Sequence, residues 1–142
     1  MSFIFANTMS TSSSKKCVPC ESLDSSMLLS VDKVQEELTS LPLWSLSSDD
    51  STNHAMKISR TFTAKNFQCA LDAMNDVGKI AEREGHHPDL HITSYRNVEI
   101  VLYTHSVGGV TENDLTMAKN IEKEVTFTYS PKWLKENPMA KH

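Results

Sequence analysis

The alternation of helical and extended apolar spacing along the chain is the feature that most limits its fold. Apolar residues at steps of three and four predict three helices, at 31–41, 64–84 and 112–125. Apolar residues at alternate positions predict four strands, which fall in pairs between the helices, at 44–46, 56–62, 90–95 and 98–105. Two hairpins favour an antiparallel sheet. We therefore expect an α+β fold, a two-layer sandwich of a four-stranded antiparallel sheet with three helices on one face (α-β-β-α-β-β-α).

The ends of the predicted helices carry recognisable signals. Ser30 is placed to cap the first helix, and Pro42 stops it. Gly85 follows the second helix, where helices often end in a left-handed residue. The stretch from Thr111 to Asp114 resembles a capping box with aspartate in place of glutamate. Within the second helix, the residues expected to face the sheet are Phe67, Leu71, Met74, Gly78 and Ala81.

Length and cysteine usage indicate a single domain inside the cell. The 142 residues suit one domain, which we place at 29–125, between a flexible leader (1–28) and a loosely ordered C-terminal tail (126–142). Three cysteines, an odd number, without a convincing secretory signal indicate a reducing compartment. The cytoplasm is the expected location. The leader is rich in serine and threonine, so import into a mitochondrion or plastid stays open.

Charge and hydropathy restrict the expected partners. The formal net charge is -4 and no block of lysine or arginine occurs, which argues against direct nucleic-acid binding. The apolar runs are too short to cross a bilayer, so we expect no membrane partner. A short chain with open sheet edges favours self-association. We therefore expect a homodimer or a homotetramer.

The histidines are the residues most suggestive of chemistry. Four of the six lie between positions 86 and 105, namely His86, His87, His91 and His105. Imidazole is the side chain best suited to moving protons near neutral pH. Pro88 restricts His87 to an extended conformation, and His105 converges on the same place if the last two strands pair. Structural histidines and a zinc site are the alternatives, although no cysteine or carboxylate stands at a familiar zinc spacing.

A wider set of residues resembles a known family. Glu82, His86-His87-Pro88, Tyr95, Thr104-His105 and Asp114 look like the signature of the pterin-4a-carbinolamine dehydratase family, also known as dimerization cofactors of a homeodomain transcription factor. The resemblance runs from Leu41 to Val125, and the family's order of elements agrees with the apolar spacing. It implies a hydro-lyase that converts a 4a-hydroxytetrahydropterin to the quinonoid dihydropterin in pterin recycling. It also implies that no metal and no cofactor is needed.

The same resemblance assigns roles to individual residues. His86, His87 and His105 are the implied catalytic residues. We expect His86 and His105 to act as acid and base at the C4a hydroxyl, and His87 to bind and assist. Asp114 is expected to serve the start of the last helix, and His91 to be structural or to lie at the rim. The expected substrate-binding residues are Gly85, Tyr103, Thr104, Ser106 and Glu82.

One other function and one other motif are open. A non-catalytic dimerization or assembly partner has the same fold, but retention of all three signature histidines favours catalysis. Cys17 and Cys20 have the C-x-x-C spacing of redox and zinc sites, without the second pair that a structural zinc site needs. Cys69 and Trp44 are expected to pack in the core.

Overall fold

The computed structural model describes residues 17–19 and 22–140 and confirms the expected α+β sandwich. The helices are α1 (Val31–Glu37), α2 (Phe67–Glu84), α3 (Glu112–Glu124) and α4 (Pro131–Glu136), with short 3-10 helices η2 (Ser25–Met27) and η3 (Leu38–Ser40). The strands are β1 (Trp44–Ser48), β2 (Ala55–Thr63), β3 (Asp89–Thr93) and β4 (Asn97–Leu102). No helix in the part of the chain that the structure describes is long and apolar enough to cross a membrane.

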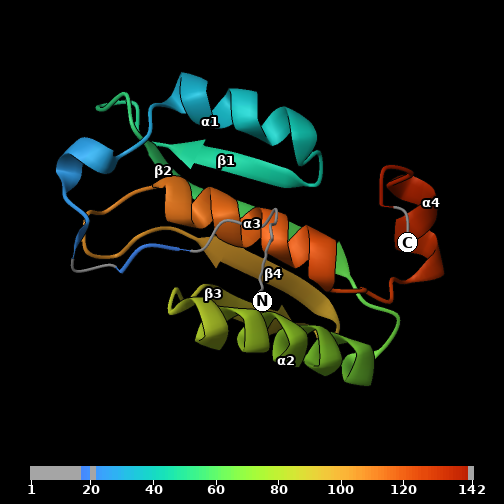
Figure 1. Ribbon diagram of the computed structural model, residues 1–142. Helices are drawn as coiled ribbons and strands as arrows, with labels where there is room; N and C mark the ends of the chain where they lie inside the picture. Colours follow the sequence, from blue (N-terminus) through green and yellow to red (C-terminus); the bar gives the residue numbers. More distant parts are fainter. Residues whose placement is uncertain (1–16, 20–21, 141–142) are drawn as a thin grey trace, which may run out of the picture.

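The four strands form one antiparallel sheet in the order β1-β2-β4-β3. Helices α1, α2 and α3 lie over one face of this sheet, and α4 lies at one end of the molecule (Figure 1). Side chains at alternate strand positions point to this face and pack against the helices. The buried residues of the two central strands on this face are Ile58, Arg60, Phe62, Val98, Ile100 and Leu102.

The buried stripe of α2 differs from the predicted one. Phe67 is 50% exposed, and Leu71, Met74 and Gly78 are partly exposed. Neighbouring residues of a helix point about 100° apart. Where adjacent positions are both apolar, either of two stripes with the same spacing could therefore face the sheet. The stripe rich in small residues packs on the sheet, because alanines allow the helix to approach closely. It consists of Ala70, Ala73, Val77, Ile80 and Ala81.

Two predicted strands are shorter in the structure. β3 ends at Thr93 because Ser94 and Tyr95 have φ of 47° and 57° and close the turn to β4. β4 ends at Leu102. The chain beyond β4 therefore leaves the sheet before His105, and its only further pairing among the described residues is a bridge from Thr104 to Gly109. The three residues that follow β4, Tyr103 to His105, belong to the site described below.

The C-terminal segment is more ordered than the expected loose tail (126–142). Within the described residues 126–140, Phe127 and Tyr129 are buried and α4 begins at Pro131, capped by the Ser130 side chain. Tyr129 also pairs with Ala64 in an isolated bridge. Contacts with distant residues fix this segment, which is why its own sequence shows no clear period. Residues 1–16 and 20–21 of the expected leader (1–28) lie outside the described residues.

Arg60 is the polar anchor for this C-terminal segment. Its side chain is only 1% exposed, and its Nε donates to the Glu122 carboxylate of α3. Its Nη2 donates to the Tyr129 hydroxyl at 2.5 Å. The guanidinium carbon lies 4.6 Å from the centroid of the Phe127 ring, within the range of a cation–π contact. Burial raises the pKa of Tyr129, so its phenol stays neutral and accepts this bond.

Replacing Arg60 tests this anchor. We expect Arg60→Ala to lower the free energy of unfolding by about 3 kcal/mol, since it leaves a partly buried Glu122 without its cation. Urea denaturation measures the change. The control is Lys33→Ala, which removes an exposed ion pair with Glu37 and should cost less than about 1 kcal/mol. Equal, small changes in the two variants would rule out the anchoring role.

Candidate active site

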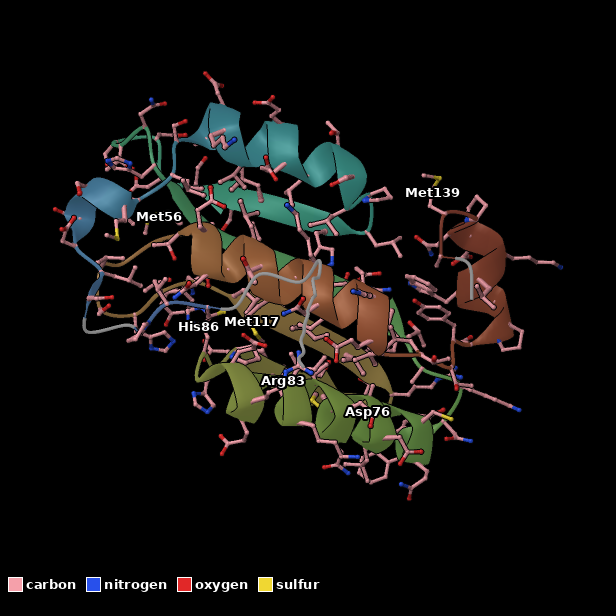
Figure 2. The ribbon with its side chains drawn as sticks, in the orientation of Figure 1. Met56, Asp76, Arg83, His86, Met117 and Met139 are labelled. Atoms are coloured by element: carbon pink, nitrogen blue, oxygen red, sulfur yellow. The ribbon has the colours of Figure 1, made fainter. Side chains whose placement is uncertain are left out.

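The C-terminal end of α2 sets the position of His86. Gly85 ends the helix in the left-handed conformation with φ of 67°, as predicted, and turns the chain toward the core. The His86 backbone N–H still bonds the Ala81 carbonyl at 3.2 Å. The His86 side chain is only 3% exposed and lies at the end of α2 near the start of α3 (Figure 2).

Asp114 holds His86 from the opposite side. This aspartate is fully buried in the first turn of α3. One carboxylate oxygen lies 2.6 Å from His86 Nε2, and a carboxylate accepts, so Nε2 donates. The other oxygen accepts from the Thr104 hydroxyl at 2.8 Å and from the Thr111 N–H at 2.9 Å. The carboxylate thus has three donors, which is what a buried charge requires.

His105 forms the second wall of the site and is held differently. Its side chain is 61% exposed and its ring stacks on Tyr103, with centroids 4.2 Å apart and planes within 6°. The Lys57 ammonium lies 4.9 Å from the centroid of the Tyr103 ring. The nearest carboxylate is Asp89, whose Oδ1 is 4.0 Å from His105 Nε2. Stacking and one long contact with a carboxylate, rather than burial, orient this imidazole.

His87 is the third histidine of the site. Its Nε2 is 2.6 Å from the Glu82 carboxylate, and both side chains are largely exposed. Pro88 follows and restricts His87 to an extended backbone. The three histidines from two separate stretches of chain meet at one cavity of about 290 Å³. Its lining residues are Gly85, His86, His87, Tyr103, His105 and Ser106.

Two predicted substrate-binding residues, Thr104 and Glu82, do not line the cavity, and neither does His91, which was expected to be structural or at the rim. Thr104 does not line the cavity, because it is buried and bonded to Asp114 and Thr111. Glu82 also lies outside the lining and contacts the cavity through His87. His91 is exposed on β3, paired in register with Glu99, and is not a lining residue.

A larger hollow lies elsewhere and has a different chemical character. It measures about 450 Å³ and is lined by strand residues such as Thr61 and Asn97, together with Trp133. Its lining contains no histidine. The smaller cavity is therefore the candidate active site, since proton transfer needs groups that titrate near neutral pH. Within the described residues, no three His, Cys, Asp or Glu side chains are grouped to hold a metal ion.

Comparison with known proteins identifies the family. A family model described as pterin 4 alpha carbinolamine dehydratase matches residues 27–124. The chain belongs to this family. A Chlorobaculum tepidum relative is 45% identical over 111 residues, covering 78% of this chain and 95% of the relative. Pterin-4-alpha-carbinolamine dehydratase 2, mitochondrial, of Arabidopsis thaliana is 40% identical over 78% of this chain, but the match covers only 57% of that protein.

A solved structure supports the same assignment. The crystal structure of a transcriptional coactivator/pterin dehydratase from Brucella melitensis matches with a TM-score of 0.58 and 31% identity. The match covers 70% of this chain and 99% of that one. Chain segments at both ends, including residues 17–19 and Phe127 onward, lie outside the matched dehydratase family model.

Sequence reasoning missed two contributions to this dehydratase-family site. Asp114 stands in the family signature and is expected first of all to serve the helix start, but its contact with His86, 28 positions away in sequence, is not predicted. No local pattern reports a contact at that separation. Lys57 and Asp89, which flank the Tyr103–His105 stack, were not singled out either. Of the C-x-x-C motif, Cys17 is half-buried, and Cys20 lies outside the described residues.

The hydroxyl of Thr104 offers a test of the buried network. We expect Thr104→Val, which keeps the shape but removes the hydroxyl, to lower the free energy of unfolding by about 2 kcal/mol. The loss arises because Asp114 is left with one donor fewer in a site without water access. Chemical denaturation measures it. The exposed Thr61→Val variant is the matched control, and a similar small effect in both would contradict the network.

Proposed function

We propose that the chain removes water from a 4a-hydroxytetrahydropterin to give the quinonoid dihydropterin, by histidine acid–base catalysis. The observation that carries the proposal is the meeting of His86, His87 and His105 at one cavity in a chain of this dehydratase family. The names of the relatives support the substrate class. The reaction would serve the recycling of oxidised pterins.

The proposed reaction needs two proton transfers and no redox change. The C4a–O bond breaks after the hydroxyl oxygen receives a proton from an acid, and water leaves. The N5–H bond loses its proton to a base, and its electron pair forms the C4a=N5 double bond. An imidazole performs either step near neutral pH. A protonated imidazole and a neutral one in the same cavity therefore complete the reaction together.

The surroundings of His86 and His105 suit these two histidines to different parts of the reaction. Asp114 fixes the buried ring of His86 in one orientation, which favours a defined approach to the pterin. His105 is exposed, so it can exchange its proton with solvent after each turnover. His87, held by Glu82, is assigned to binding and assistance. We assign His86 and His105 as the acid–base pair at the C4a hydroxyl.

The remaining lining residues are assigned to pterin binding. Gly85 has no side chain, so a planar ring can approach the backbone there. Tyr103 and Ser106 supply hydrogen-bonding groups at the cavity wall. Thr104 acts from behind the wall, through Asp114, rather than by direct contact. A purely structural partner of the same fold would need none of these groups to converge.

We also propose a location inside the cell. Cytoplasm and an imported location in a mitochondrion or plastid are both compatible with this chemistry. The description of the Arabidopsis relative as mitochondrial supports the imported alternative.

Activity of single histidine variants tests the proposed chemistry. We expect His105→Ala to lower kcat for dehydration of synthetic carbinolamine by about 100-fold or more, because general acid–base groups contribute at least that much. Its melting temperature should not change, since the side chain is exposed. Stopped-flow absorbance measures kcat. His91→Ala is the control, and turnover at the wild-type rate in His105→Ala would remove His105 from the mechanism.

We further propose that the chain is a homo-oligomer. Phe67 is 50% exposed on α2, with the partly exposed Leu71 and Met74 following on the same face. A contiguous apolar stripe on a helix favours contact with a second copy. The edge strands β1 and β3 also have unpaired sides, which favour association.

Light scattering tests this association. We expect the wild-type chain to elute as a dimer or tetramer at micromolar concentration, and Phe67→Glu to shift it toward the monomer because a charge would be buried in the contact. Tyr95→Glu is the matched control, since Tyr95 is 58% exposed but lies in the β3–β4 turn. A monomeric wild-type chain would refute the proposal, and equal shifts in both variants would place the contact elsewhere.

A further inference from the structure

A short N-terminal segment contacts the residues that adjoin the His86–Asp114 pair. Residues 17–19, which we call the strap, run between the C-terminal end of α2 and the N-terminal end of α3 (Figure 1). The strap precedes residue 27, where the match to the family model begins. Its position beside this pair needs an explanation of its own.

The strap is held through its backbone. The Val18 N–H donates to Asn113 Oδ1 at 2.9 Å, and Asn113 Nδ2 donates to the Val18 carbonyl at 2.8 Å. The Cys17 N–H donates to the Glu84 carboxylate at 3.1 Å. The Cys17 Sγ lies 3.6 Å from the Asn113 carbonyl oxygen. One amide side chain therefore pairs with both backbone groups of a single residue, as a neighbouring β-strand would.

The side chains that receive the strap are themselves buried. Asn113 is 4% exposed, and the side chain of Glu84 is 5% exposed. Val18, in contrast, is 48% exposed, so its side chain is not what is recognised. Pro19 restricts Val18 to an extended backbone, which prepares the strap for this pairing. The contact thus depends on backbone groups rather than on the side chain at position 18.

Both receiving residues adjoin the groups of the active site. Glu84 is two residues before His86 and closes α2, and Asn113 is directly before Asp114 in the first turn of α3. Arg83 makes a two-pronged ion pair with Glu124, at 2.7 and 2.8 Å, which ties α2 to the far end of α3 and raises the pKa of Arg83. The strap connects the C-terminal end of α2 to the N-terminal end of α3.

We propose that the strap is a positioning element for catalysis, which fixes the distance between the helix ends that carry His86 and Asp114. The proposal rests on the proposed dehydration at this site. By holding Glu84 and Asn113 together, the strap limits the ways in which the His86–Asp114 hydrogen bond can open. Small displacements of a proton-transfer group cost rate more than substrate binding.

A backbone substitution tests the strap without touching the catalytic residues. Val18→Pro removes the N–H that Asn113 accepts, and Val18→Ala is the matched control that keeps it. We expect Val18→Pro to lower kcat about threefold to tenfold, the range for one lost hydrogen bond, with KM within about twofold of wild type. Val18→Ala should keep wild-type kcat and KM. Val18→Pro should also lower the melting temperature by a few degrees, because the buried Asn113 amide loses a donor, whereas Val18→Ala should leave it unchanged.

A double-mutant cycle adds a second measurement. Asn113→Ala removes the same contact from the other side. Its effect on kcat should therefore not multiply with that of Val18→Pro. Multiplying effects would overturn the proposal, because they would show that the two residues act separately.

The remaining outcomes separate this inference from the proposed function. An inactive wild-type chain would refute both the dehydratase proposal and the proposed role of the strap. An active wild-type chain with unchanged kcat in Val18→Pro would overturn the strap alone. Equal losses in Val18→Pro and Val18→Ala would assign the effect to the side chain and also overturn it.

Discussion

The buried carboxylate of Asp114 is the constraint on which the site depends. A charge without solvent contact is stable only with several donors, and His86, Thr104 and Thr111 supply them from three parts of the chain. The end of α2, the segment after β4 and the start of α3 must therefore meet at one point. Because the end of α2 and the segment after β4 also line the cavity, the requirement to satisfy one carboxylate brings the two lining segments together.

The site combines a rigid wall with an open one. His86 is enclosed and hydrogen-bonded, whereas His105 is exposed and held by stacking on Tyr103. A dehydration needs both properties, since the pterin must be positioned accurately while protons and water exchange with solvent. The rigid side is built from helix ends, which packing holds in place. The open side is formed by the residues after β4, where the chain has left the sheet. A ligand can approach the site from this side, because His105 is exposed there.

Sequence spacing predicted the order of the elements and the sheet, because period and turn signals are local. It predicted a stripe of α2 that shares only Ala81 with the buried one, because apolar residues at neighbouring positions form competing stripes and only the sheet decides between them. The histidines were found through residue type and resemblance. Asp114 was ranked as structural, because its bond to His86 forms only after the helices pack. The C-terminal order around Tyr129 was missed for the same reason, since its anchor is a distant arginine.

Segments outside the matched family region hold α3 at both of its ends. Before that region, Val18 pairs with Asn113 in the first turn of α3. After it, Tyr129 accepts from Arg60, which also bonds Glu122 in the last turn. Because Asp114 belongs to this helix, any sliding or tilting of α3 would move the carboxylate relative to His86. The contacts of Val18 and Arg60 therefore hold the first and last turns of α3, the helix that carries Asp114.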